Sequence, residues 1–155
     1  MDRKVSIGFG PHLTLDLYGC DQTRLLDDKY IYNLLDKLPA KIGMHKISQP
    51  AVNKFTSNPL GKKRSFDQGG ISAFVLIAES HITIHTFVAQ SFASVDIFSC
   101  KNFDVEKAEK HLMKAFSATK AEKNFLLRGK EFPKNVEVVK PIVASERKSI
   151  VKKRC

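Results

Sequence analysis

Three β-rich segments follow one another closely in the middle of the chain, and this succession constrains the fold more than any other feature. Residues 71–78 are almost wholly apolar, 81–87 alternate between polar and apolar side chains, and 92–100 are again rich in β-branched and aromatic residues. Consecutive strands of this kind predict an antiparallel sheet. The apolar character of 71–78 further predicts a strand that is buried on both faces.

The flanking segments add two helices and more strands. Residues 12–18 alternate with leucine at every second position, 44–52 and 122–127 also favour strands, and 56–70 has the Pro and Gly content of a loop. Asp21 can cap a helix whose apolar residues recur at helical spacing until Pro39 and Gly43, and Asp104 can cap another that runs to about Phe116. The predicted order is β-α-β-β-β-α-β, an α+β two-layer sandwich with both helices on one face of the sheet. A homodimer that stacks sheet on sheet would cover the other face.

Length and charge indicate one domain with a basic tail. The chain has 155 residues, of which 43% are hydrophobic, and a net charge of +10. Such a length supports a single core, which we assign to residues 1–133. Residues 134–155 form the tail, and Lys62-Lys63-Arg64 is a second basic stretch. A basic tail can bind RNA, an anionic membrane or an acidic partner, but a solvated tail explains it more simply. No aromatic RNA-binding stretch or Cys/His finger spacing predicts a nucleic-acid partner.

The cysteines and the apolar runs indicate in which compartment the protein is expected. Cys20, Cys100 and Cys155 are widely spaced and include no C-x-x-C pair, so we expect reduced thiols, no metal site and a cytoplasmic protein. The longest apolar run, 73–78, is far shorter than the roughly 20 residues of a membrane span. The first residues lead into no apolar signal segment, so we expect neither secretion nor a membrane partner.

The densest polar cluster is the stretch 79–86. On a strand, His81, Thr83 and His85 share one face, and Asp96 and Cys100 share a face of the next segment. A solvated strand face accounts for this pattern as readily as a functional site does. His81 and His85 would lie about 13 Å apart along the strand, which is too far for one metal ion. From spacing alone, the pattern therefore predicts a polar strand beside a thiol and no particular reaction.

This cluster resembles the core of the prokaryotic S-adenosylmethionine decarboxylase family. The resemblance is carried by Glu79-Ser80-His81-Ile82-Thr83-Ile84-His85-Thr86 and by Val95-Asp96-Ile97-Phe98-Ser99-Cys100. Gly70-Ile71-Ser72, His12-Leu13 and Tyr18-Gly19-Cys20 match the same pattern. The resemblance spans about residues 9–130 and leaves the basic tail outside.

The resemblance implies a self-processing carboxy-lyase. The bond between Glu79 and Ser80 would break autocatalytically and give chains 1–79 and 80–155. The Ser80 hydroxyl would attack the preceding carbonyl to form an ester, and β-elimination and hydrolysis would convert the serine into a pyruvoyl group. That group would form a Schiff base with the substrate amine and accept the electron density left by CO₂. No free cofactor is implied, and the cleaved chains are expected to form a homodimer.

The resemblance also implies roles for single residues. His85 would transfer a proton during processing, with Ser72 beside it, and Cys100 would return a proton to the substrate. Phe66 would stack on the adenine of S-adenosylmethionine, and Asp16 would lie near the substrate.

One departure from the family pattern concerns the substrate. The expected reaction decarboxylates S-adenosylmethionine to the aminopropyl donor for spermidine synthesis. The family has aromatic-Pro-Glu after Ile-His-Thr, where this chain has Phe87-Val88-Ala89, so a carboxylate that would accept the ribose hydroxyls is missing. The alternatives are a pyruvoyl-dependent ornithine or arginine decarboxylase, or a non-enzymatic basic interaction protein on the same scaffold.

Overall fold

The structure is a computed structural model that describes residues 10–55 and 69–129. Six strands and three helices follow in the order β1 (Gly10–Tyr18), α1 (Gln22–Leu25), α2 (Asp28–Lys41), β2 (Ala51–Phe55), β3 (Gly70–Ile77), β4 (Ser80–Phe87), β5 (Phe92–Ser99), α3 (Val105–Phe116) and β6 (Lys120–Arg128). Phe66, Lys62-Lys63-Arg64, Cys155 and the tail 134–155 lie outside the described residues.

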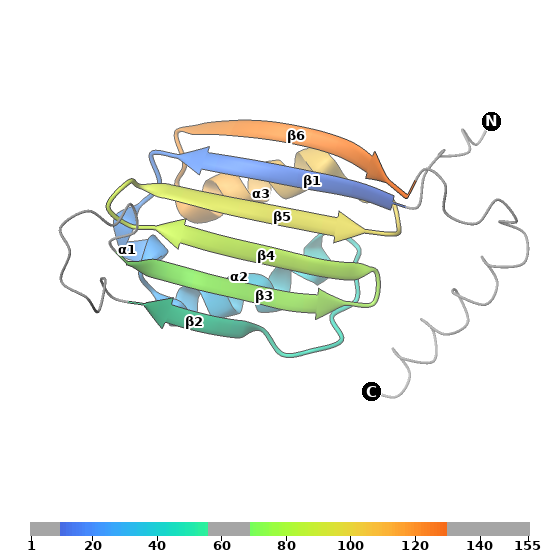
Figure 1. Ribbon diagram of the computed structural model, residues 1–155, viewed down its shortest axis with the longest axis horizontal. Coiled ribbons are helices and arrows are strands. Elements are labelled where there is room, and N and C mark those ends of the chain that lie inside the picture. The colour runs from blue at the N-terminus through green and yellow to red at the C-terminus, as the bar shows by residue number, and fades with distance from the viewer. Residues whose placement is uncertain (1–9, 56–68, 130–155) are drawn as a thin grey trace, which may run out of the picture.

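The strands form one antiparallel sheet, and the helices cover one of its faces (Figure 1). The strand order is β2-β3-β4-β5-β1-β6, so β1 lies between two strands from the second half of the chain. The predicted α+β two-layer sandwich is therefore confirmed. No described helix has the length and apolarity needed to cross a membrane.

Four strands separate the helices, one more than the predicted order counts. The sequence pattern already marks four strands there, at 44–52, 71–78, 81–87 and 92–100, and the order β-α-β-β-β-α-β written from it omits one of them. The strand expected at 44–52 is displaced to β2, and Pro50, which cannot donate a ladder hydrogen bond, lies just before it. Lys46 makes only an isolated bridge to Ile77.

The helices begin at aspartates, as the sequence suggests, but there is one more helix than expected. Asp21 caps the short α1, Asp27 caps α2 and Asp104 caps α3, each accepting a backbone N–H. Helix α2 also continues past Pro39 to Lys41. One extended helix therefore becomes two because a second capping aspartate interrupts the pattern.

Alternation along the strands divides the sheet into a buried face and an open face. Leu13, Leu15 and Leu17 are fully buried beneath the helices, together with Ile82 and Ile84 of β4. Burying each such side chain contributes about 1.5–3 kcal/mol. The opposite side, which we call the open face, carries the polar positions of the same strands. Within the single chain, β3 is therefore buried on one face only, because Phe74 and Leu76 are each 43% exposed on the open face.

Candidate active site

The Glu79–Ser80 bond lies in the tight turn that joins β3 to β4. Ile77 pairs with Ser80, which leaves Ala78 and Glu79 as the two turn residues. Two-residue hairpin turns favour positive φ within the turn. Here the positive φ, 153°, falls on Ser80 instead, in a region that residues with side chains rarely adopt. Such a conformation costs about 1–3 kcal/mol and persists where surrounding contacts hold it.

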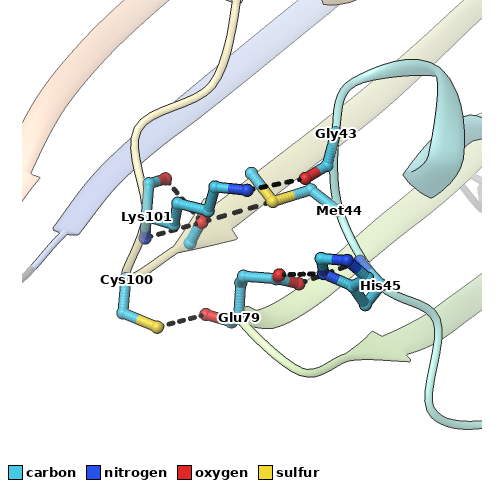
Figure 2. A network of polar contacts seen from close by, with 7 residues as sticks. Gly43, Met44, His45, Glu79, Cys100 and Lys101 are labelled. Carbon is cyan, nitrogen blue, oxygen red and sulfur yellow. Dashed lines mark hydrogen bonds and ion pairs between the residues drawn. The ribbon is translucent and has the colours of Figure 1, made fainter. Parts of the chain in front are cut away.

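Cys100 holds the carbonyl of this bond. Its backbone N–H donates to the Glu79 carbonyl oxygen at 2.9 Å, and its Sγ donates to the same oxygen at 3.0 Å. Cys100 directly follows β5, whose last residue Ser99 pairs with Ser80. The register of β4 and β5 thus brings the thiol to the Glu79 carbonyl, as Figure 2 shows.

His45 holds the side chain of Glu79, which is only 3% exposed. The ring Nδ1 lies 2.7 Å from Glu79 Oε1, and the His45 backbone N–H donates to Oε2 at 3.1 Å (Figure 2). Because a carboxylate oxygen accepts, Nδ1 carries a proton in this contact. We call the group His45, Glu79, Ser80 and Cys100 the turn cluster.

A second group of candidate residues crosses the open face toward the other ends of these strands. His85 Nδ1 is 3.1 Å from Ser72 Oγ, and their positions are paired in the ladder between β3 and β4. His85 pairs in turn with Ser94 of β5, which pairs with Asp16 of β1. We call Ser72, His85, Ser94 and Asp16 the cross-strand row.

The two groups are well separated within one chain. Ser80 and His85 stand five positions apart on β4, or about 17 Å at roughly 3.3 Å per residue. The predicted pairing of His85 with Ser72 is thus present, but neither side chain is brought to Ser80. Asp16 likewise belongs to the cross-strand row rather than to the turn cluster.

Polar and aromatic side chains fill the open face between the groups. His12 Nε2 lies 3.1 Å from Asp96 Oδ1, and the His81 ring lies 5.8 Å from that of Phe98. Burial lowers the pKa of His81, and nearby His12 adds to this effect. His81, Thr83 and His85 share this face, as the alternation predicts.

The surroundings of Asp16 and Cys20 raise the pKa of both side chains. Burial raises the pKa of Asp16, and Glu122 and Asp96 raise it further. Burial also raises the pKa of the Cys20 thiol to about 11, which makes Cys20 an inert core residue. Neither Cys20 nor Cys100 forms a disulfide. The described residues include no group of three or more metal-ligating side chains.

The sequence interpretation missed His45. The motif covers residues 79–86. His45 lies 34 residues before Glu79, in a segment whose composition predicts a strand. A single histidine without a motif gives no signal that it meets Glu79. Only the path of 44–47 beside the end of β3 brings the two together.

Comparisons with known proteins agree with this architecture. Residues 11–129 match the family model for S-adenosylmethionine decarboxylase. The chain is 36% identical over 122 residues to the S-adenosylmethionine decarboxylase proenzyme of Clostridium botulinum, which covers 78% of this chain and 95% of that protein. It is 32% identical over 121 residues to S-adenosylmethionine decarboxylase proenzyme 2 of Halalkalibacterium halodurans, covering 77% and 86%.

The fold is similar to the crystal structure of the adenosylmethionine decarboxylase from Aquifex aeolicus. The TM-score is 0.61 at 26% sequence identity, over 79% of this chain and 92% of that one. Fold and sequence together define a decarboxylase, that is, a carboxy-lyase. The chain belongs to the S-adenosylmethionine decarboxylase family, of the bacterial type.

Proposed function

We propose that this chain is a cytoplasmic S-adenosylmethionine decarboxylase that cleaves itself between Glu79 and Ser80, forms its own pyruvoyl group and makes the aminopropyl donor for spermidine synthesis. The observation that carries the proposal is the Glu79 carbonyl, which accepts two hydrogen bonds from Cys100 beside a serine of positive φ. The names of the relatives support the substrate.

The first step is attack of Ser80 Oγ on the Glu79 carbonyl carbon. The C–O bond forms, the peptide C–N bond breaks, and the hydroxyl proton passes to the released Ser80 amine. Negative charge develops on the Glu79 carbonyl oxygen, where both Cys100 donors already lie at 2.9 and 3.0 Å. One such donor contributes about 10²–10³ in rate. The strain at Ser80 is released as the C–N bond opens.

The second step requires a base. Removal of the Ser80 Cα proton expels the Glu79 carboxylate from Cβ and leaves dehydroalanine, which water converts into the pyruvoyl group with loss of ammonia. His85, oriented by Ser72, is the proposed base. Because His85 lies about 17 Å from Ser80 along β4, a second copy of the chain must supply it.

A two-fold dimer stacked on the open face supplies this base. The turn cluster lies at the edge of the sheet where β3 turns into β4, and the cross-strand row crosses the open face near the other ends of these strands, so a two-fold axis between them would set each group of one copy against the other group of its partner. The exposed Phe74 and Leu76 would also be buried in such an interface. The proposed enzyme is therefore a homodimer of cleaved chains.

The pyruvoyl group supplies the electron sink for decarboxylation when it has formed. This chain's own residues then position the substrate and move a proton. Cys100, freed from the scissile carbonyl, is the proposed proton donor to the substrate Cα, and Asp16 of the partner copy would face the substrate. Phe66 is proposed to stack on the adenine.

A second candidate substrate class is favoured by one observation. Val88 and Ala89 lie in the connection from β4 to β5, three and four residues after His85, and offer no carboxylate to a ribose. Ornithine and arginine have no ribose. Release of CO₂ from S-adenosylmethionine, ornithine and arginine by the same preparation separates these possibilities. Release from none of them would favour the non-enzymatic interaction protein.

Intact mass under denaturing conditions tests the self-cleavage. We expect two chains of 79 and 76 residues, the second blocked at its N-terminus by the pyruvoyl group. Ser80→Ala should give one whole chain without decarboxylase activity, because it removes the attacking oxygen. Activity in the Ser80→Ala chain, or a wild-type chain that stays whole on long incubation, would contradict the proposal.

A further inference from the structure

Glu79 carries a second functional group besides its carbonyl, namely a side-chain carboxylate buried at the edge of the sheet. An unpaired buried carboxylate is strongly unfavourable, so its partner has a large influence on how the turn is held. Both carboxylate oxygens are bound by a single residue, His45, through the ring Nδ1 and the backbone N–H. The His45 side chain is itself 52% exposed, so its contact with Glu79 lies at the surface end of the buried carboxylate.

The chain holds His45 firmly against this turn. The His45 carbonyl accepts from the Ala78 N–H at 2.8 Å, and the Ile47 N–H donates to the Leu76 carbonyl at 3.0 Å. Between them, Lys46 bridges to Ile77 in the ladder and forms an ion pair with Asp36 of α2. The imidazole is therefore fixed relative to the scissile bond by the backbone on both sides and by a helix.

We propose that His45 is a positioning residue for self-cleavage, which holds the acyl half of the scissile bond through the Glu79 carboxylate. The inference rests on the proposed function. His45 holds the side chain of Glu79, and Cys100 holds its carbonyl oxygen. Together these contacts keep the carbonyl carbon in position while Ser80 Oγ attacks it. Reaction rates depend steeply on such placement.

His45 also serves the elimination step. When the Cβ–O bond of the ester breaks, the electron pair goes to the Glu79 α-carboxylate, and the proton of Ser80 Cα goes to the base. Glu79 then carries two negative charges, one on its side chain and one on its new carboxyl terminus. The ring Nδ1 and the backbone N–H of His45, both bound to the side-chain carboxylate, partly offset its charge and so reduce repulsion between the two.

Two nearly isosteric substitutions test this role. His45→Leu removes the ring donor, whereas His45→Asn keeps an N–H donor near the position of Nδ1. Freshly synthesised full-length chains are followed by intact mass, which gives the rate of cleavage. We expect His45→Leu to cleave at least tenfold more slowly than wild type and His45→Asn to recover most of that loss. His111→Asn on α3, remote from the turn, is the matched histidine control and should cleave at the wild-type rate.

A double-mutant cycle shows whether His45 acts through Glu79. Glu79→Gln removes the buried charge, so His45→Leu in that background should change the rate by less than about threefold. If His45→Leu fails to fold, His45→Ala replaces it with the same expected result. Equal thermal midpoints for His45→Leu and His45→Asn would separate positioning from stability.

The possible failures are distinguishable. A wild-type chain that cleaves while His45→Leu cleaves equally fast overturns the role of His45 and leaves the proposed function intact. An equal loss in the wild-type and Glu79→Gln backgrounds overturns the route through the carboxylate. A wild-type chain that does not cleave overturns the proposed function and this inference with it.

Discussion

The turn cluster and the cross-strand row, which lie toward opposite ends of β3 and β4, differ in how completely one chain builds them. In the turn cluster, the Glu79 carbonyl and carboxylate accept four contacts from His45 and Cys100, which belong to segments distant in sequence. In the cross-strand row, His85 and Ser72 contact each other on an open surface, and His85 is exposed. One end thus holds the bond that we propose is cleaved, and the other holds the proposed base, about 17 Å away along β4. This difference is the ground for the proposed site shared between two copies.

The largest effect is expected at His85. His85→Ala should slow self-cleavage at least a hundredfold, because a general base contributes about 10²–10⁴ in rate. Coexpression with a tagged Ser80→Ala chain should restore cleavage of the His85→Ala chain, since the Ser80→Ala copy brings an intact His85 to the mixed dimer. Intact mass of the separated chains measures this. If the mixed dimer forms and the His85→Ala chain in it stays whole, the base acts within one chain. The site would then not be shared between two copies.

The next effect concerns the donors of the turn cluster. Cys100→Ala removes one of two hydrogen bonds to the Glu79 carbonyl and should slow cleavage by about a hundredfold. Cys100→Ser keeps a hydroxyl donor and should cleave faster than Cys100→Ala. After cleavage, both variants should release CO₂ from S-adenosylmethionine slowly. Full turnover by the cleaved Cys100→Ala enzyme would remove its role as proton donor.

A smaller effect, an increase in kcat/KM, is expected for a substitution beside the cross-strand row. Ala89→Glu would restore a carboxylate for the ribose hydroxyls, and each charge-assisted hydrogen bond contributes about 1.5–3 kcal/mol. The value of kcat/KM for S-adenosylmethionine should therefore rise about tenfold, with the rate of self-cleavage unchanged. An unchanged kcat/KM for S-adenosylmethionine, combined with faster CO₂ release from ornithine or arginine, would indicate a different substrate.

The smallest effect concerns stability. The pKa of Asp16 is raised, so the folded chain binds its proton more tightly than the unfolded chain, and stability falls as pH rises above the ordinary pKa of 3.8. Asp16→Asn should then raise the thermal midpoint of the uncleaved Ser80→Ala chain at pH 7 by about 1–3 °C, and the gain should shrink toward pH 4. An unchanged thermal midpoint at pH 7 would show that the charged Asp16 side chain does not destabilise the folded chain. In the cleaved enzyme, the same variant should lower CO₂ release.

Local patterns were enough to predict the sheet and which side chains share a face. The alternation at 12–18 and 81–87 predicted the buried leucines and the common face of His81, Thr83 and His85, because strand geometry depends on neighbouring residues. The family resemblance picked out Ser72, His85 and Cys100, and the structure pairs the first two and brings the third to Glu79.

Contacts between distant segments could not be predicted in this way. The position of His45 depends on how the segment after α2 passes β3, and no periodicity encodes that path. The separation of His85 from Ser80 follows from simple strand arithmetic, but its meaning appears only when the ladder shows two groups toward opposite ends of the same strands. Phe66 and the basic tail lie outside the described residues and remain predictions.

The strand order has a consequence for the two products that the proposed cleavage would give. Cleavage in the turn before Ser80 assigns β1, β2 and β3 to one product and β4, β5 and β6 to the other, yet β1 is held between β5 and β6, and β3 stays paired with β4. The two fragments are interleaved within one sheet, so neither can leave without unfolding both. Folding of the precursor is a unimolecular event, whereas refolding of the mature protein requires two separate chains to meet. If the chain is cut as proposed, the mature enzyme therefore depends on having folded beforehand.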